Sequence, residues 1–204
     1  MLEDFLVWKK KLGLSFYWRG TIRGNLFTKK EDLDLLLRLR ENGCDNLTYS
    51  LESSNPEILK AMHKHVNIDQ FKYQTKLIKE SGINVATSLV IGYPQETEDT
   101  IKDTFDVCID CGISPSVGYL LPQLGTEVYD YARRGGIIDD VEEYLLALGD
   151  RQDLRLNMTK MSDETLKRTV EENIVRCNEA LGVEMITDNL LKTQTYFLPA
   201  KNKH

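Results

Sequence analysis

The sequence predicts an α/β fold, mainly because one pattern recurs along its first two thirds. Four times a glycine precedes a short apolar run, and these glycines, at positions 13, 43, 82 and 112, stand 30, 39 and 30 residues apart. Stretches with helical periodicity come before the last three, and glycine is the residue most often found just past a helix end. Helices and strands that alternate at this spacing indicate parallel βα units with right-handed crossovers.

Local signals predict the individual elements. Apolar residues recur every three or four positions ahead of the last three glycines, which predicts a helix before each. Thr28, with a glutamate three residues later, has the signature of a capping box, and Asn55 before a proline is typical of a helix start. Strands are expected at residues 14–18, 47–51, 85–92 and 117–121. The third is almost continuously apolar, as in a strand covered on both faces.

The repeat stops after Tyr131. Further on we expect helices at residues 139–149 and 162–181, and a short strand or extended tail at residues 182–204. Four βα units are too few to close an eight-stranded barrel. We therefore predict a partial parallel βα barrel over residues 1–136, with about four βα units, and a C-terminal helical extension over residues 137–204.

The composition is that of an ordinary soluble globular protein. Of the 204 residues 41% are hydrophobic and 28% are charged, and the net charge is −6. An acidic chain argues against sequence-independent nucleic-acid binding, although a local basic groove stays open. No apolar run reaches the ~20 residues of a membrane span, and the acidic Glu3 and Asp4 argue against a signal peptide. Four cysteines do not make a disulfide scaffold, so we expect a reduced, cytoplasmic protein.

Polar residues follow each expected strand, and parallel α/β folds bind ligands at the carboxyl ends of their strands. The four groups are Arg19, Gly20 and Arg23; Glu52, Ser53 and Ser54; Gly92, Tyr93 and Pro94; and Pro122, Gln123, Gly125 and Thr126. Turn chemistry alone explains any one group, but four on one edge favour a ligand-binding rim. Glu52 is the most informative, because a carboxylate there can accept two hydrogen bonds from a ribose. Alternatively, Glu52 caps the next helix or pairs with Lys60 or Lys64.

The cysteines and histidines favour packing over metal binding. Cys108 and Cys111 have the spacing of redox and metal sites, but one such pair without a second is a weak signal. Cys108 also lies on the apolar stripe of its expected helix, which favours a buried thiol. His63 and His65 flank a lysine near a helix end, where the helix dipole favours basic residues. We predict no metal site formed by this chain.

Three ordered segments resemble motifs of the radical S-adenosylmethionine (SAM) superfamily. Residues 43–64 carry a Glu-Ser pair followed by ILKAMHK, residues 81–97 carry an apolar strand that ends in IGYPQET, and residues 122–129 form the turn PQLGTEVY. Leu124 stands where many relatives have proline. The resemblance covers about residues 14–135, and the stretch 156–162 is similar to members that carry a cobalamin-binding domain ahead of the radical SAM core.

The resemblance implies a six-stranded partial βα barrel. In that family a 4Fe–4S cluster donates an electron to SAM, and the resulting 5′-deoxyadenosyl radical abstracts hydrogen from a substrate. The resemblance assigns SAM-binding positions to eight residues: Glu52 and Ser53 beside the ribose, Lys64 toward the carboxylate with Arg23 reaching the same pocket, and Ile91, Gly92, Tyr93 and Pro94 along the adenine. It assigns no catalytic residue and no substrate.

One departure from the family pattern is severe. The family holds its cluster with three cysteines in a CxxxCxxC loop, and this sequence contains no such triplet. The first two strands and the Gly-Gly-Glu turn that receives the SAM amino group are also missing. Thiolates hold the iron and tune its potential, so the resemblance places the 4Fe–4S cluster only in an intact parent. The sequence is expected to be the C-terminal two thirds of a radical SAM core, from a shortened gene, a cut piece or a degenerate copy.

Three functions are consistent with the sequence. The first is the SAM-binding part of a radical SAM enzyme, which would not cleave SAM alone. The second is a non-enzymatic module that uses the rim, or an open sheet edge, to hold a partner. The third is an unrelated small α/β enzyme with Glu52 as acid or base, which the order of the motifs makes the weakest.

Overall fold

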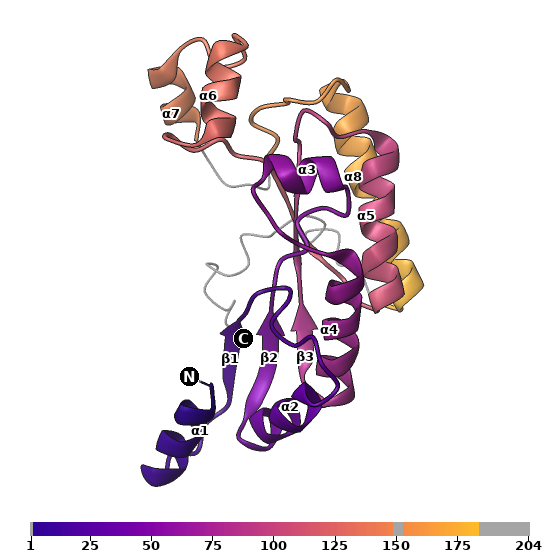
Figure 1. Ribbon diagram of the computed structural model, residues 1–204. Helices are drawn as coiled ribbons and strands as arrows, with labels where there is room; N and C mark the ends of the chain where they lie inside the picture. The colour runs from indigo at the N-terminus through magenta and orange to yellow at the C-terminus, as the bar shows by residue number, and fades with distance from the viewer. Residues whose placement is uncertain (1, 149–152, 184–204) are drawn as a thin grey trace, which may run out of the picture.

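The computed structural model describes residues 2–148 and 153–183, and Figure 1 shows how its elements follow one another. The elements are α1 (Leu2–Lys11), β1 (Trp18–Thr21), α2 (Asp32–Glu41), β2 (Cys44–Thr48), α3 (Pro56–Ala61), α4 (Ile68–Glu80), β3 (Asn84–Ala86), β4 (Ser88–Ile91), α5 (Glu98–Cys111), β5 (Ser116–Tyr119), α6 (Glu127–Arg134), α7 (Val141–Ala147) and α8 (Asp163–Leu181). The prediction for residues 184–204 lies outside the described part of the chain.

All strand pairs in the described residues are parallel, which confirms the α/β prediction. One sheet has the order β1-β2-β3, and a second pairs β4 with β5. The chain beyond β2 joins the two sheets, because Glu52 forms a single parallel bridge with Leu89. In that bridge the Glu52 N–H donates to Ser88 (3.0 Å) and the Val90 N–H donates to Glu52 (3.2 Å). Alternating strands and helices thus give one continuous parallel arrangement.

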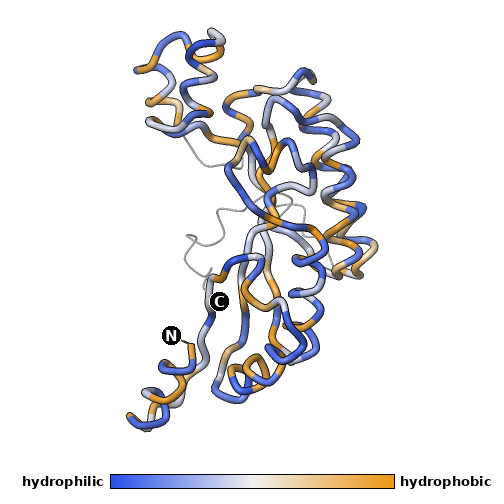
Figure 2. The backbone as a smooth tube through the Cα atoms, viewed as in Figure 1, coloured by the Kyte–Doolittle hydropathy of each residue, from blue (hydrophilic) through white to orange (hydrophobic). Residues whose placement is uncertain are grey.

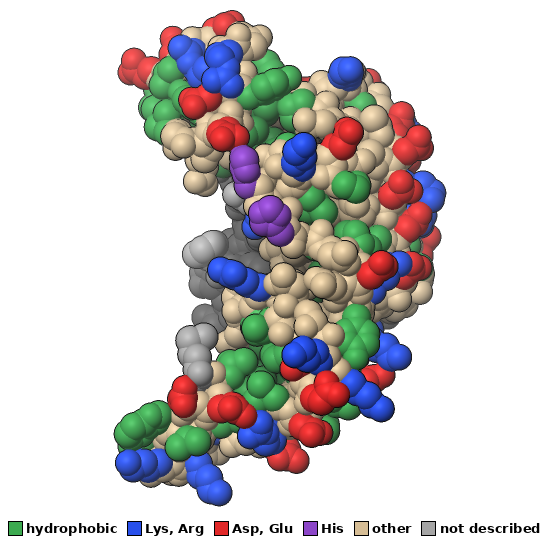
Figure 3. Space-filling view, in the orientation of Figure 1, with side chains coloured by type: hydrophobic (Ala, Val, Ile, Leu, Met, Phe, Trp, Pro, Cys, Tyr) green, Lys and Arg blue, Asp and Glu red, His purple; other side chains and the backbone are tan. Residues whose placement is uncertain are grey.

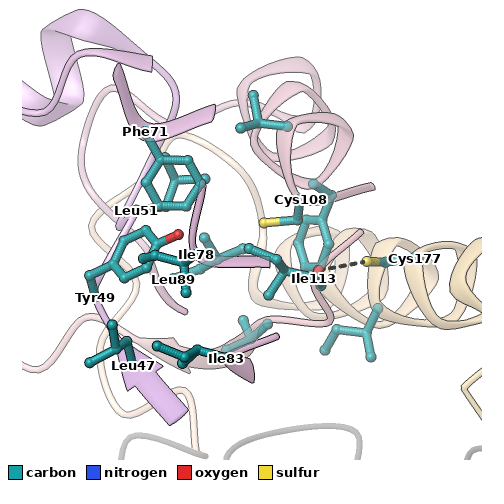
Figure 4. Close-up of a cluster of buried hydrophobic side chains, with 14 of the residues drawn as sticks. Leu47, Tyr49, Leu51, Phe71, Ile78, Ile83, Leu89, Cys108, Ile113 and Cys177 are labelled. Carbon is teal, nitrogen blue, oxygen red and sulfur yellow. Dashed lines mark hydrogen bonds between the residues drawn. The ribbon is translucent and has the colours of Figure 1, made fainter. Parts of the chain in front are cut away.

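Helices cover one face of the β1–β3 sheet. Leu47 lies opposite Gly20 and Val85 in the register, and it is buried on the face that α2 and α4 cover. The same hydrophobic core includes Tyr49 and Phe71, whose rings meet edge to face with centroids 5.1 Å apart (Figure 4). An aromatic pair of this kind adds about 0.5–1.5 kcal/mol to the burial itself.

The opposite face of this sheet is polar. Arg19, Asn46 and Asn84 are neighbours in the register, and so are Thr21 and Thr48. None of these five side chains is buried. The expected third strand, residues 85–92, is divided between β3 and β4, which belong to different sheets. In β4, Leu89 is buried in the main core while Val90 packs against a second apolar cluster, so the expected cover on both faces holds for β4 and not for β3.

The segment before β1 also differs from its prediction. The apolar residues from Leu14 to Tyr17 lie outside any strand, and β1 begins at Trp18, where its N–H donates to the Gly43 carbonyl at 2.9 Å. The capping box at Thr28 is likewise wrong. Helix α2 begins at Asp32, whose carboxylate accepts a hydrogen bond from the Lys29 N–H at 2.8 Å.

Helix α8 returns to pack along α5, so the C-terminal part of the chain joins the main core (Figure 1). Its apolar stripe, which the sequence predicts, is buried; the residues are Leu166, Val170, Ile174 and Cys177. Helices α6 and α7 form a separate small cluster, in which the Tyr129 and Tyr144 rings lie 6.0 Å apart. These two residues stand on either side of the expected boundary at residues 136 and 137, which stays a prediction.

Hydrophobic and hydrophilic residues alternate along the helices, as Figure 2 shows. Such alternation is typical of helices that bury one face against a core and leave the other in water. In the described ranges, none of the helices has both the length and the hydropathy that crossing a bilayer requires.

Candidate functional site

The carboxyl ends of the parallel strands meet along one edge, and most of the predicted site residues lie there. Arg23 lies two residues beyond the end of β1, Glu52 lies in the bridge that follows β2, and Gly92 lies directly after β4. This edge borders the hollow side of the molecule, where Figure 3 shows histidine side chains beside the concave surface. Loops at this edge are where parallel α/β folds place their ligands.

Glu52 has a strained backbone and an unsatisfied buried oxygen. Its φ is +64°, and only one other described residue apart from glycines, His63, has a positive φ. Its Oε1 lies 3.3 Å from the Lys64 ammonium, while Oε2 is buried and has no hydrogen-bond partner among the described residues. Backbone strain costs about 1–3 kcal/mol and concentrates at functional sites. A buried oxygen without a donor also costs stability unless a ligand supplies one.

Ser53 takes a different position from Glu52. It is fully buried, and its hydroxyl oxygen accepts a hydrogen bond from the Asn55 N–H at 3.2 Å. Asn55 in turn caps α3 through the N–H groups of Glu57 (2.9 Å) and Ile58 (3.2 Å). The structure therefore gives Ser53 a local role, because it fixes the turn that presents Glu52. Asn55 confirms the helix start that the sequence predicts.

The strand end at Gly92 is held by Glu96. The carboxylate of Glu96 accepts hydrogen bonds from the Gly92 and Tyr93 N–H groups. The Glu96 N–H donates to the Tyr93 carbonyl at 2.9 Å. Burial raises the pKa of Glu96 to about 8, although both backbone donors lower it. The turn from Gly92 to Glu96, which includes Pro94 and follows the buried Ile91, is thus closed on itself.

Arg23 lies in an exposed loop that Gln74 holds in place. The side chain of Gln74 is fully buried in α4, and its amide nitrogen donates to the Arg23 carbonyl at 3.0 Å. Its Oε1 accepts hydrogen bonds from the N–H groups of Leu26 (2.7 Å) and Phe27 (2.8 Å). One amide therefore satisfies three buried or half-buried backbone groups, which sets the path of the loop at this edge of the sheet.

Replacement of Gln74 by alanine is expected to lower the free energy of unfolding by about 2–3 kcal/mol, because three backbone groups lose their partner. Chemical denaturation of Gln74→Ala measures the change, and Gln70→Ala, on the exposed side of the same helix, is the matched control. Equal losses in the two variants would contradict the role given to Gln74.

The cysteines do not fit an iron–sulfur cluster. Cys44, Cys108 and Cys177 are fully buried, Cys111 is half-buried, and all four are free thiols. Burial raises the pKa of the Cys44 thiol to about 11 and also raises the pKa values of the other three. Iron is held by thiolates, which burial disfavours. Within the described ranges, no three His, Cys, Asp or Glu side chains gather into a group that could hold a metal ion.

The nucleoside part of SAM fits the site better. A ribose supplies hydroxyl donors, and the unpaired Oε2 of Glu52 is a buried acceptor at the strand end. The Lys64 ammonium beside Oε1 is a cation within reach of an anionic group. The residues present are thus compatible with this cofactor on chemical grounds.

Comparison with known proteins gives one family match. The family model described as the radical SAM superfamily matches residues 10–108. The stretch from residue 10 to residue 108, just under half of the chain, thus has the pattern of the radical SAM superfamily. This family uses SAM and a 4Fe–4S cluster, and the matched residues include Glu52, Lys64 and Gly92.

Two curated proteins and one solved structure are similar to this chain. An uncharacterised methyltransferase of Pyrococcus horikoshii is 27% identical over 60% of this chain and 26% of its own length. The tRNA-2-methylthio-N(6)-dimethylallyladenosine synthase of Treponema denticola is 29% identical over 57% of this chain and 26% of its own length. The chain therefore spans about a quarter of these relatives. Coproporphyrinogen III oxidase (HemN) of Escherichia coli, a radical SAM enzyme, shares the fold with a TM-score of 0.59 over 88% of this chain and 37% of its own, at 15% identity.

Sequence reasoning missed two residues that shape this edge of the sheet. Glu96 stands in the quoted IGYPQET segment, yet nothing in that segment predicts its contact with the backbone at Gly92. Gln74 lies on the apolar stripe of α4 between Phe71 and Leu77. A polar side chain on an otherwise apolar helix face is the signal for such a residue, since buried polar groups need partners.

Proposed function

We propose that this chain is the SAM-binding part of a radical SAM enzyme. The observation that carries the proposal is Glu52, whose strained backbone and unpaired buried oxygen stand at the strand edge beside Lys64. Bound SAM would supply the adenosyl radical chemistry of the family only together with a cluster. The residues of this chain would bind and orient the nucleoside.

The roles divide among the predicted site residues. Glu52 would accept the ribose hydroxyls, and Lys64, half-exposed beside it, would hold the SAM carboxylate. The backbone from Ile91 to Pro94, which Glu96 holds in place, would line the adenine. Ser53 would act through the turn rather than by direct contact, because its side chain is fully buried and its hydroxyl oxygen accepts from Asn55. Arg23, exposed on the loop that Gln74 fixes, would reach the same pocket.

The proposed architecture is a partial βα barrel, with residues 1–136 as its core and residues 137–204 as a C-terminal extension. The parallel strands and the polar face of the β1–β3 sheet support it, since a barrel interior that binds a cofactor needs polar side chains. The cluster would come from outside this chain, so the chain alone would not cleave SAM. Four free thiols support a reducing, cytoplasmic environment. The cobalamin-containing subgroup stays a prediction.

Binding of SAM to the full chain tests the proposal. Isothermal titration calorimetry is expected to detect SAM binding that Glu52→Gln weakens about tenfold or more, because the neutral amide is a weaker acceptor for two hydroxyls. Glu57→Gln, an exposed glutamate in α3, is the matched control and should leave the affinity unchanged. Absent binding, or equal affinity in all three proteins with circular dichroism showing that each is folded, would contradict the proposal.

A second function, a module that holds a partner protein, is favoured by one observation. Strand β1 pairs with β2 on one side only within the described chain, and large apolar side chains beside it are exposed. They include Trp8 (55% exposed), Leu12 (63%) and Tyr17 (83%). Open edges with apolar neighbours promote association. A chain that self-associates in sedimentation velocity experiments and does not bind SAM would favour this function over the first.

A further inference from the structure

A cavity opens beside Lys64, and its charged lining is entirely basic. It has a volume of about 460 Å³ and lies between α3, the turn that follows it and the start of α4. Lys60, His63, Lys64 and His65 line it together with Ser54, and no carboxylate does. This concentration of basic groups stands out in a chain whose net charge is −6.

Two of these side chains have no partner in the described part of the protein. Lys64 pairs with Glu52, and His63 binds the Glu127 carboxylate at 2.8 Å. The side chains of Lys60 and His65 make no hydrogen bond or ion pair with any described residue. The cavity therefore holds donors that the protein itself does not use.

His63 occupies a backbone position that suits glycine. Its φ is +52°, directly after the end of α3, where the Lys64 N–H donates to the Leu59 carbonyl at 2.9 Å. Glycine is the usual residue at this place because a side chain costs about 1–2 kcal/mol in the left-handed region. The exposed pair with Glu127 offsets little of that cost. A residue other than glycine at this strained backbone position, with its side chain lining a basic cavity, points to a use for that side chain.

We propose that this cavity binds a phosphoryl group of the substrate. Lysine ammonium groups and imidazole N–H groups are strong donors to phosphate oxygens. The positive end of α4, whose N-cap Asn67 also lines the cavity, adds to the field. The source is either a phosphorylated small molecule or the backbone of a nucleic acid, since both present the same oxygens.

Lys64 connects this cavity to the proposed SAM site. Its ammonium reaches Glu52, while its side chain lines the basic cavity. A bound phosphoryl group would thus lie one side chain away from the nucleoside of the cofactor. Only the interpretation as a substrate contact rests on the proposed function, because anion binding by the cavity does not require SAM.

The test is carried out on the full chain without SAM at low ionic strength. Inorganic phosphate, a nucleoside monophosphate and a short single-stranded RNA are titrated separately. The double variant Lys60→Ala/His65→Ala is expected to bind phosphate about tenfold more weakly or worse, since two charge-assisted donors are gone. The matched control, Lys29→Ala/Lys30→Ala, removes two exposed lysines elsewhere and should bind as the parent does. Unchanged binding in the first variant, or an equal loss in the control, would overturn the inference.

His63→Gly adds a second readout that a purely structural residue would not give. We expect its melting temperature to rise, because the left-handed strain is relieved, while its phosphate affinity falls. A variant that gains stability and keeps its affinity would remove His63 from the cavity's function and contradict its part in the inference.

The source of the phosphoryl group follows from which ligand binds more tightly, RNA or the nucleoside monophosphate, provided that this preference is lost in Lys60→Ala/His65→Ala. A chain that binds phosphate but not SAM keeps the anion site and refutes the proposed function. A chain that binds SAM but not phosphate keeps the proposed function and refutes the anion site.

Discussion

Replacement of Glu96 by glutamine is expected to remove a strong pH dependence from the stability of this protein. Glu96 is buried, and its pKa is raised to about 8 by burial, against 4.5 for an ordinary glutamate. The native carboxyl group thus keeps its proton between about pH 4.5 and 8, while the unfolded chain has lost it. Folding takes up a proton in this window, so stability falls as pH rises through it and levels off above pH 8.

The expected slope is at most about 1.4 kcal/mol per pH unit, which accumulates to a few kcal/mol across the window. Glutamine resembles the protonated form, because its carbonyl oxygen can still accept from the Gly92 N–H. The free energy of unfolding of the variant should therefore lack this pH dependence. As pH rises the parent loses stability, and the variant becomes the more stable of the two. At pH 5 the two proteins should differ little.

Denaturant unfolding between pH 4.5 and 8.5 gives the free energy of unfolding of both proteins. Because all other titrating groups are the same in the two proteins, the difference between these free energies reports on Glu96 alone. Glu57→Gln, on the exposed surface of α3, controls for the loss of a carboxylate as such and should parallel the parent. Parallel curves for Glu96→Gln and the parent would mean that Glu96 is charged in the native state. The turn at Gly92 would then depend on a carboxylate with two charge-assisted hydrogen bonds.

The helices could be predicted because their signals are local. The apolar stripe from Leu166 to Cys177 and the cap at Asn55 depend on residues a few positions apart, and the structure confirms both. The first strand begins later than predicted because strand limits depend on a partner. Apolar residues from Leu14 onward suggest a strand, yet pairing begins only at Trp18, where the carbonyl of Gly43 is in reach.

The candidate site could likewise be predicted only where its signals are local. The position of Glu52 at a strand end could be read from the sequence, because a polar Glu-Ser pair follows an apolar run. Its positive φ, its unpaired oxygen and the burial of Ser53 depend on how residues 52–55 join the second sheet. The hydrogen bond from the Gln74 side chain to the Arg23 carbonyl joins residues about 50 positions apart in the sequence, and no local pattern reveals such a contact.

Gly43 is expected to tolerate no side chain, and Gly43→Ala should lower the free energy of unfolding by about 3 kcal/mol or more. Its φ is +88°, and the Cβ of an alanine there would overlap the carbonyl oxygen of Phe16. The left-handed backbone accounts for about 1–2 kcal/mol of the loss. The rest comes from the clash, because the main chain of Phe16 must move and the first hydrogen bond of β1, from Trp18 to Gly43, is weakened.

Gly82→Ala separates these two causes. Gly82 also follows a helix, with φ +78°, but the nearest atom to the Cβ of an alanine at this position is the Nε of Arg40, at 3.8 Å. This variant should therefore show only the backbone cost of about 1–2 kcal/mol. Chemical denaturation of the two variants gives the difference, and amide hydrogen exchange at Trp18 reports whether the first rung of β1 has opened. Equal losses, with Trp18 still protected in Gly43→Ala, would mean that the segment before β1 yields without cost. Strand β1 would then be held in the sheet by its pairing with β2 from Gly20 onward, and not by the close approach of Phe16 to Gly43.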